Sequence, residues 1–196
     1  MHPDDVRDFV AACYDDLRAS IDQHPEFGVK STELDGTDIY VLIDVGHAAA
    51  APVDVALARE LSGNKTLLIA VGPGLYEERI FGTPVVPDLG NLTQRELLLH
   101  IGCDDFDGKP PLADLLRPSD RTPLPDNEWP KDGTNRGIVP NHPTYKRKFF
   151  CRPGFREFHK HPEHEDHPWD QIRAEATLAQ HVMGLIHDLK FRWKLQ

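Results

Sequence analysis

Cysteine and histidine residues gather in one segment of the chain, HPTYKRKFFCRPGFREFHKHPEHEDHPW (142–169). Cys151 is followed at short intervals by His159, His161 and His164. A thiolate is a strong nucleophile, and imidazole gains and loses protons near neutral pH. This combination is suited to covalent catalysis assisted by a general base.

Cys151 has two interpretations. Nearby cations favour the thiolate, and five basic residues surround Cys151 in the sequence: Lys146, Arg147, Lys148, Arg152 and Arg156. We therefore expect a reactive thiol, although a buried and inert cysteine behind two phenylalanines is the alternative. A papain-like Cys-His pair also stays open, because its base can come from a distant part of the chain. Cys13 and Cys103 lie in apolar runs and are expected in the core.

The histidines admit a metal site as an alternative to proton transfer. His159 and His161 are two residues apart, so on a strand they would point the same way. With His164 they would supply the three imidazoles that suffice for catalytic zinc. The same residues would otherwise be solvated loop side chains or groups that position the backbone. HKHPEHE is also similar to the first metal motif of cupins, but no second histidine motif follows, which excludes that family.

Composition narrows the class of protein. The formal charge is −10, from 22 Lys and Arg against 32 Asp and Glu. Such an acidic chain is poorly suited to nucleic acid or an anionic membrane as partner. No apolar run approaches the ~20 residues that span a bilayer, and the first residues have neither a basic start nor an apolar run, so no secretory signal is expected. Three cysteines form no disulfide framework, so we expect a reducing, cytoplasmic setting.

The hydrophobic pattern predicts an α+β fold in a single domain over residues 1–196, in which 26–64 form an additional α/β element. Eleven of the 17 prolines lie between Pro110 and Pro168, so an ordered but loop-rich face is expected over about 106–168. Helices are predicted over 4–24, 53–61 and 170–191, the last with Asp170 as N-cap. Strands are predicted near 28–34, 38–45, 65–71, 78–86 and 95–103, with turns at Asp35-Gly36 and at 72–74.

The order of these pieces resembles the ubiquitin-conjugating (UBC-like) family. In that family a strand leads into a YP…PP turn, then an HPN motif, the catalytic cysteine, a tryptophan and a helix. The corresponding pieces here are 106–111 (FDGKPP), 142–144 (HPT), Cys151, Trp169 and 170–191. The most similar kind is the divergent bacterial members, encoded beside a ubiquitin-like protein, an activating enzyme and a JAB-type peptidase. The resemblance implies an antiparallel sheet flanked by an N-terminal helix and a C-terminal amphipathic helix, with a long Pro/His-rich active-site loop.

What the resemblance implies for function is acyl transfer. Cys151 would accept a ubiquitin-like protein from its activating enzyme as a thioester and pass it to a target protein, without a cofactor. His142 would shape the loop around the cysteine. Thr144 stands where the family has the asparagine of HPN, and the stretch from Cys151 to Trp169 is longer than in the family.

Roles for the remaining residues follow from the needs of the transfer step, which requires a base for the attacking group and donors for the oxyanion. His159 or His161 is expected to act as the base, and Glu157 to orient a histidine. Arg156, or the backbone near Gly154, is expected to face the oxyanion. Two alternatives stay open: a zinc-dependent hydrolase or metal-binding protein that uses His159, His161 and His164, and a non-catalytic UBC-like adaptor with Cys151 buried.

Overall fold

The chain, described here from a computed structural model, forms two compact units. The first comprises residues 1–45 and 96–196, and the second comprises 46–95. The structure describes residues 2–46, 66–72, 75–80, 96–106, 108–131, 137–164 and 166–193. Among the described helices, none is both long and apolar enough to cross a membrane.

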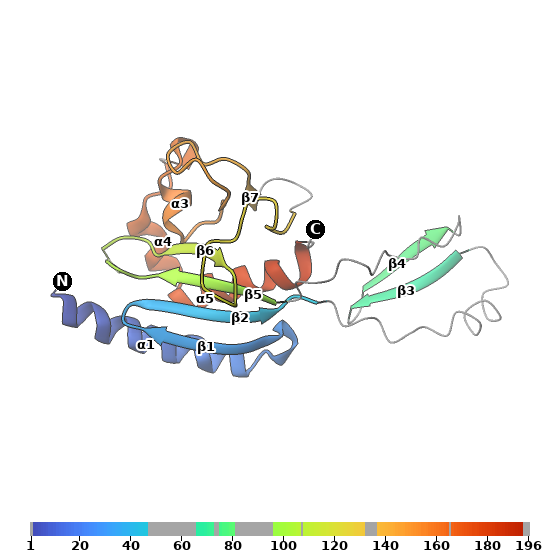
Figure 1. Cartoon of the computed structure of the whole chain (residues 1–196), viewed down its shortest axis with the longest axis horizontal. Coiled ribbons are helices and arrows are strands. Elements are labelled where there is room, and N and C mark those ends of the chain that lie inside the picture. Colours follow the sequence, from blue (N-terminus) through green and yellow to red (C-terminus); the bar gives the residue numbers. More distant parts are fainter. Residues whose placement is uncertain are drawn as a thin grey trace. The chain divides into compact units, whose positions relative to one another are not determined.

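A four-stranded antiparallel sheet forms the centre of the first unit (Figure 1). Its strands are β1 (Val29–Asp35), β2 (Asp38–Asp44), β5 (Glu96–Gly102) and β6 (Leu112–Leu116), in the order β1-β2-β5-β6. Burial alternates along β2, which is typical of a strand with one face on the core. The α+β class is therefore confirmed, with an antiparallel sheet as expected.

Three of these strands match the sequence prediction, and one was missed. β1 and β2 are joined by a two-residue turn between the paired residues Asp35 and Asp38, with Gly36 at φ +63°. β5 confirms the strand predicted near 95–103. β6 was not predicted, because it directly follows two prolines. It lies at the edge of the sheet, where prolines at the start of a strand are tolerated.

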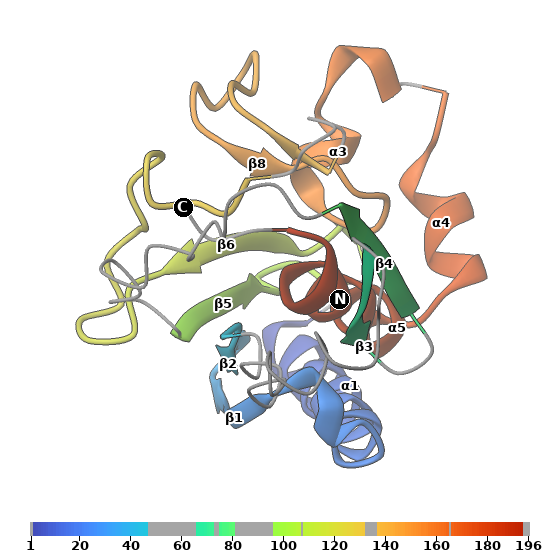
Figure 2. The ribbon, with the colours of Figure 1, turned by 90° about the vertical axis from the view of Figure 1, so that its right-hand side faces the viewer.

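Helix α1 (Pro3–Asp22) confirms the N-terminal helix predicted over 4–24. The His2 amide donates to the Asp5 carboxylate at its first turn (3.2 Å). Figure 2 shows α1 and α5 on the same face of the sheet. The core between these helices and the sheet contains buried apolar residues from α1, the sheet and α5: Val6, Val10, Leu17, Ile39, Val41, Ile43, Leu97, Leu99, Ile101, Leu115, Leu178, Val182, Leu185 and Ile186.

The single helix predicted over 170–191 is wrong. The chain forms α4 (Trp169–Glu175), α5 (Leu178–His187) and a π-helical turn, η4 (Asp188–Arg192). The break occurs because Thr177 starts a new helix: its hydroxyl accepts from the Gln180 amide, and the Gln180 side chain accepts from the Thr177 amide. Pro168, not Asp170, is the N-cap residue of α4.

Short elements order the loop-rich segment that precedes α4. They are β7 (Ile138–Val139), β8 (Phe149–Phe150), α3 (Arg156–His159) and the 3-10 turn η3 (Pro162–His164). Another 3-10 turn, η1 (Pro25–Phe27), follows α1. β7 pairs with β8 antiparallel. The buried side chains of Leu124, Trp129, Ile138, Phe149 and Phe150 show that the segment covers a core, as the sequence predicts.

The second unit contains an antiparallel hairpin of β3 (Thr66–Gly72) and β4 (Leu75–Ile80). β3 confirms the strand predicted over 65–71, and β4 begins earlier than the strand predicted over 78–86. The helix predicted over 53–61, residues 73–74 of the predicted turn and residues 81–86 lie outside the described residues.

Candidate active site

Cys151 and His164 form the contact at the centre of the site. The thiol of Cys151, directly after β8, lies 3.2 Å from His164 Nε2. The His164 ring stacks on Phe158, with ring centroids 3.9 Å apart and planes inclined by 10°. The stacking fixes the orientation of the imidazole, so a nucleophile and a base are held together. The sequence pointed to His164 only as a metal ligand.

The backbone before Cys151 is held by packing and by hydrogen bonding. Phe150 is fully buried between two tryptophans, with its ring centroid 5.0 Å from that of Trp129 and 5.6 Å from that of Trp193. The Cys151 amide donates to the Gly137 carbonyl at 2.9 Å. Cys151 itself is half-buried, so its side chain stays partly exposed next to the packed Phe150.

The electrostatic surroundings of Cys151 differ from the prediction. Burial raises the pKa of the thiol, and the negative charge of Glu163 raises it further. Three of the five basic residues nearby in sequence pair with acidic residues instead: Arg147 with Asp114 and Glu157, Arg152 with Asp188, and Arg156 with Asp104. These contacts give no support to the expectation of a thiol activated by surrounding cations, and a thiol with a raised pKa needs a base for activation.

His164 has the protonation state that a base requires. Burial lowers its pKa below the ordinary value near 6.5, and the neighbouring His161 lowers it further. The imidazole is then neutral at neutral pH and can accept a proton from the thiol. The resting pair is a neutral thiol and a neutral imidazole.

His142 is completely buried and holds the loop that leads to Cys151. Its Nε2 lies 2.9 Å from the Glu157 carbonyl, which fixes the proton on Nε2. Its Nδ1 accepts from the amides of Thr144 (3.0 Å) and Tyr145 (3.2 Å). All hydrogen-bonding capacity of the ring is used for the backbone, which is the loop-shaping role that the sequence led us to expect.

Glu157 is fully buried and acts differently from the expectation. One oxygen of its carboxylate accepts from Arg147 (3.3 Å), which also pairs with Asp114 on β6. The other, Oε2, has no hydrogen-bond partner among the residues that the structure describes. Burial raises the pKa of Glu157 to about 7. In the described hydrogen bonds the Glu157 carboxylate contacts Arg147 and no histidine, whereas the main-chain carbonyl of Glu157 contacts His142 Nε2.

His159 and His161 do not contact the thiol in the described hydrogen-bond network. His159 Nδ1 lies 2.9 Å from the His167 carbonyl, and its Nε2 accepts from the Gly154 amide (3.4 Å). His161 Nδ1 accepts from the Glu163 amide at 3.3 Å. The sequence predicted a base at His159 or His161, but these bonds engage both rings with backbone groups, whereas the ring of His164 lies beside the thiol.

The two expected oxyanion donors are also engaged elsewhere. Arg156 Nε donates to the Pro110 carbonyl at 3.1 Å, and the guanidinium pairs with Asp104. The Arg156 amide donates to the Pro111 carbonyl at 2.7 Å. Arg156 thus fastens α3 to the turn between β5 and β6, while the Gly154 amide points to His159.

A metal site is not assembled by the described side chains. Within the described ranges, which omit Glu165, no group of three or more His, Cys, Asp or Glu side chains is placed to hold a metal ion. At least one ring nitrogen of His159, of His161 and of His164 already lies at hydrogen-bond distance from another group. The geometry therefore gives the zinc alternative no support.

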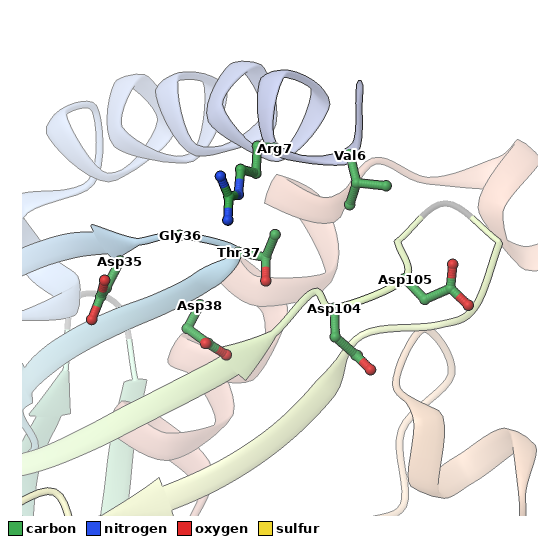
Figure 3. Close-up of a pocket in the computed structure, with 8 residues that line it drawn as sticks. All are labelled: Val6, Arg7, Asp35, Gly36, Thr37, Asp38, Asp104 and Asp105. Atoms are coloured by element: carbon green, nitrogen blue, oxygen red, sulfur yellow. The ribbon is translucent and has the colours of Figure 1, made fainter. Parts of the chain in front are cut away.

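A separate cavity of about 390 Å³ lies between α1, the β1–β2 turn and the residues after β5 (Figure 3). Cys151 is not part of its lining, which includes four aspartates and one arginine. The lining residues are Val6, Arg7, Asp35, Gly36, Thr37, Asp38, Asp104 and Asp105. Asp38 and Asp104 are already paired, with His100 and Arg156 respectively.

No protein-family model matches the chain, and no curated protein matches its sequence. The function must therefore be argued from the arrangement around Cys151.

Proposed function

We propose that the protein is a UBC-like acyl carrier, in which Cys151 accepts the C-terminus of a ubiquitin-like protein as a thioester. The observation that carries this proposal is the 3.2 Å contact between the Cys151 thiol and His164 Nε2. It supplies a base for a thiol whose pKa is raised, at the surface of a rigid loop.

The order of elements supports the UBC-like assignment. The chain runs from α1 into an antiparallel sheet, with Pro110 and Pro111 between β5 and β6. The loop with buried His142 comes next, then Cys151 and the helices α4 and α5. The hairpin of β3 and β4 is inserted between β2 and β5 in the sequence.

Thioester formation uses the pair in one step. As Sγ of Cys151 attacks the carbonyl carbon of the acyl group on the activating enzyme, His164 Nε2 takes the thiol proton. A new C–S bond forms, and the C–S bond to the activating enzyme breaks. The imidazolium then returns its proton to the departing thiolate.

Transfer to the target reverses these roles. An amine or hydroxyl of the target attacks the thioester carbonyl and gives up its proton to His164. The C–S bond to Cys151 breaks, and the thiolate of Cys151 regains a proton from the imidazolium. The chain supplies nucleophile and base without a cofactor, and its partners are the ubiquitin-like protein, the activating enzyme and the target. We place these partners in the cytoplasm.

A second candidate rests on the same contact. A cysteine hydrolase also uses a thiol beside an imidazole, and its acyl-enzyme is released by water instead of by an amine. The two functions differ in the direction of loading. The carrier is charged by an activating enzyme with ATP, whereas the hydrolase cleaves a finished ester or amide without ATP.

A charging assay separates the candidates. The protein is mixed with an activating enzyme, ATP and a ubiquitin-like protein, and a mobility shift that dithiothreitol reverses is expected. Cys151→Ala must abolish the shift, and Cys13→Ala, which removes a thiol of α1, must keep it. A shift that persists in Cys151→Ala rejects the proposal, and cleavage of an ester substrate without ATP favours the hydrolase.

A further inference from the structure

Arg152, the residue directly after Cys151, is tied to the end of helix α5 by an ion pair with Asp188. The Asp188 side chain is only 7% exposed. Its carboxylate also accepts from Arg192 Nη1 at 3.2 Å and lies 3.4 Å from His187 Nδ1. A carboxylate this buried is costly unless it is paired, so Asp188 holds its partners in defined positions.

Gly184 provides the space through which Arg152 reaches Asp188. A Cβ atom at position 184 would overlap the guanidinium of Arg152. Glycine weakens the interior of a helix, so its presence in the middle of α5 needs a reason, and the close approach of Arg152 is one.

A second contact between the same helix and the same turn lies at Gly154. Gly154 has φ +97°, and a Cβ atom there would overlap the ring of His181. His181, Gly184 and Asp188 are spaced by three and four residues, so they share one side of the helix. This side of α5 and of η4, which continues it, therefore packs against the turn 151–154.

We propose that Asp188 is a positioning residue for Cys151: by holding Arg152 across Gly184, it keeps the thiol against His164. This inference rests on the proposed role of Cys151 as nucleophile. The backbone on the other side of Cys151 is fixed by Phe150 between its two tryptophans. The ion pair completes the support on the side toward α3, where the chain turns at Gly154.

The test compares three substitutions around the ion pair. Asp188→Asn removes the charge that holds Arg152, and Gly184→Ala displaces the guanidinium while favouring the helix. Arg192→Gln is the matched control, because it removes the other arginine on Asp188 without touching the turn. The reading is the rate of Cys151 alkylation by iodoacetamide as a function of pH, with thermal unfolding recorded beside it.

We expect Asp188→Asn and Gly184→Ala to lose the part of the pH profile that depends on His164, so that both profiles match that of His164→Gln. Charging by the activating enzyme should fall about 10- to 100-fold in both, and Arg192→Gln should stay within about twofold of the native protein. Asp188→Glu, which keeps the charge, should recover part of the rate.

The proposal is overturned if Gly184→Ala keeps the native profile, or if Arg192→Gln changes it as much as Asp188→Asn. If Asp188→Asn fails to fold, Gly184→Ala decides, because alanine is the better helix former. Alkylation needs no ubiquitin-like partner. A native protein that is never charged but shows the His164-dependent profile would reject the proposed function and leave the positioning role standing.

Discussion

The thiol of Cys151 and Nε2 of His164 lie 3.2 Å apart, and burial shifts both pKa values toward the neutral forms of the two groups. A neutral pair differs from a preformed thiolate–imidazolium pair, because the proton moves only when the nucleophile attacks. The reactivity of Cys151 should then depend more on the base than on the pKa of the thiol alone.

His164→Gln should slow both alkylation and charging of Cys151. General base catalysis is typically worth about 10²- to 10⁴-fold, so a loss of about 100-fold in the charging rate is expected. His24→Gln, at an exposed position two residues after the end of α1, is the control and should leave the rate unchanged. Equal rates in His164→Gln and the native protein would remove His164 from the mechanism.

The charging rate should depend on pH in a direction set by His164. Burial lowers its pKa below the ordinary value near 6.5, so the imidazole becomes half protonated only at a pH below that value. The rate should therefore decline as the pH falls, with a midpoint below about pH 6.5, as the base becomes protonated. Single-turnover charging across this range measures the profile, and His164→Gln should lack the decline.

Glu157 should make the fold less stable as the pH rises. Its pKa is about 7 in the folded state, whereas that of an unperturbed glutamate is 4.5. The folded state thus retains a proton that the unfolded state releases, and this stabilisation is lost as the pH rises from about 4.5 through about 7. Urea unfolding at about pH 5 and about pH 8 should show a loss on the order of 1–3 kcal/mol in the native protein relative to Glu157→Gln. Parallel pH dependence of the two proteins would contradict the assignment.

His142→Ala should destabilise the fold by about 2–4 kcal/mol, because it leaves the Glu157 carbonyl and two backbone amides without their partner. His24→Ala, which removes an exposed imidazole, should change the free energy of unfolding by less than about 0.5 kcal/mol. A change of similar size in both variants would show that the buried hydrogen bonds of His142 contribute little.

Thr177→Ala should cost about 1 kcal/mol by removing the cap of α5. Ser119→Ala deletes a hydroxyl at an exposed loop position and serves as the control. Chemical denaturation measures both. If Thr177→Ala is as stable as the native protein, then α4 and α5 do not depend on the cap for their separation.

Local patterns determined the parts of the fold that the sequence could predict. The hairpin of β1 and β2 follows from alternating apolar residues and from the turn signal Asp35-Gly36. Both can be seen in a few consecutive residues of the sequence. The break between α4 and α5 also has a local signal, since Thr177 and Gln180 have the spacing of a capping box. That signal was outweighed in the prediction by the apolar stripe that continues through it.

The site was less predictable because its contacts are distant in sequence or depend on an irregular loop. The arginines around Cys151 suggested a thiolate, but their partners Asp104, Asp114 and Asp188 lie 33 to 52 residues away from them. The choice of His164 over its neighbours depends on the turn η3, which has no hydrophobic period to reveal it. Cys151 was predicted as the nucleophile from its residue type and its place after His142, and that role is part of the proposal.

The most direct test of the account is the chemical bond formed at position 151. Cys151→Ser should be charged by the activating enzyme with ATP and the ubiquitin-like protein to give an oxyester that resists dithiothreitol and is cleaved by alkali, while the native adduct is released by dithiothreitol. Peptide mass spectrometry should locate both adducts on residue 151. An adduct on a residue other than 151 would contradict the proposed role of Cys151. So would the absence of any adduct when the activating enzyme in the assay is itself charged with the ubiquitin-like protein.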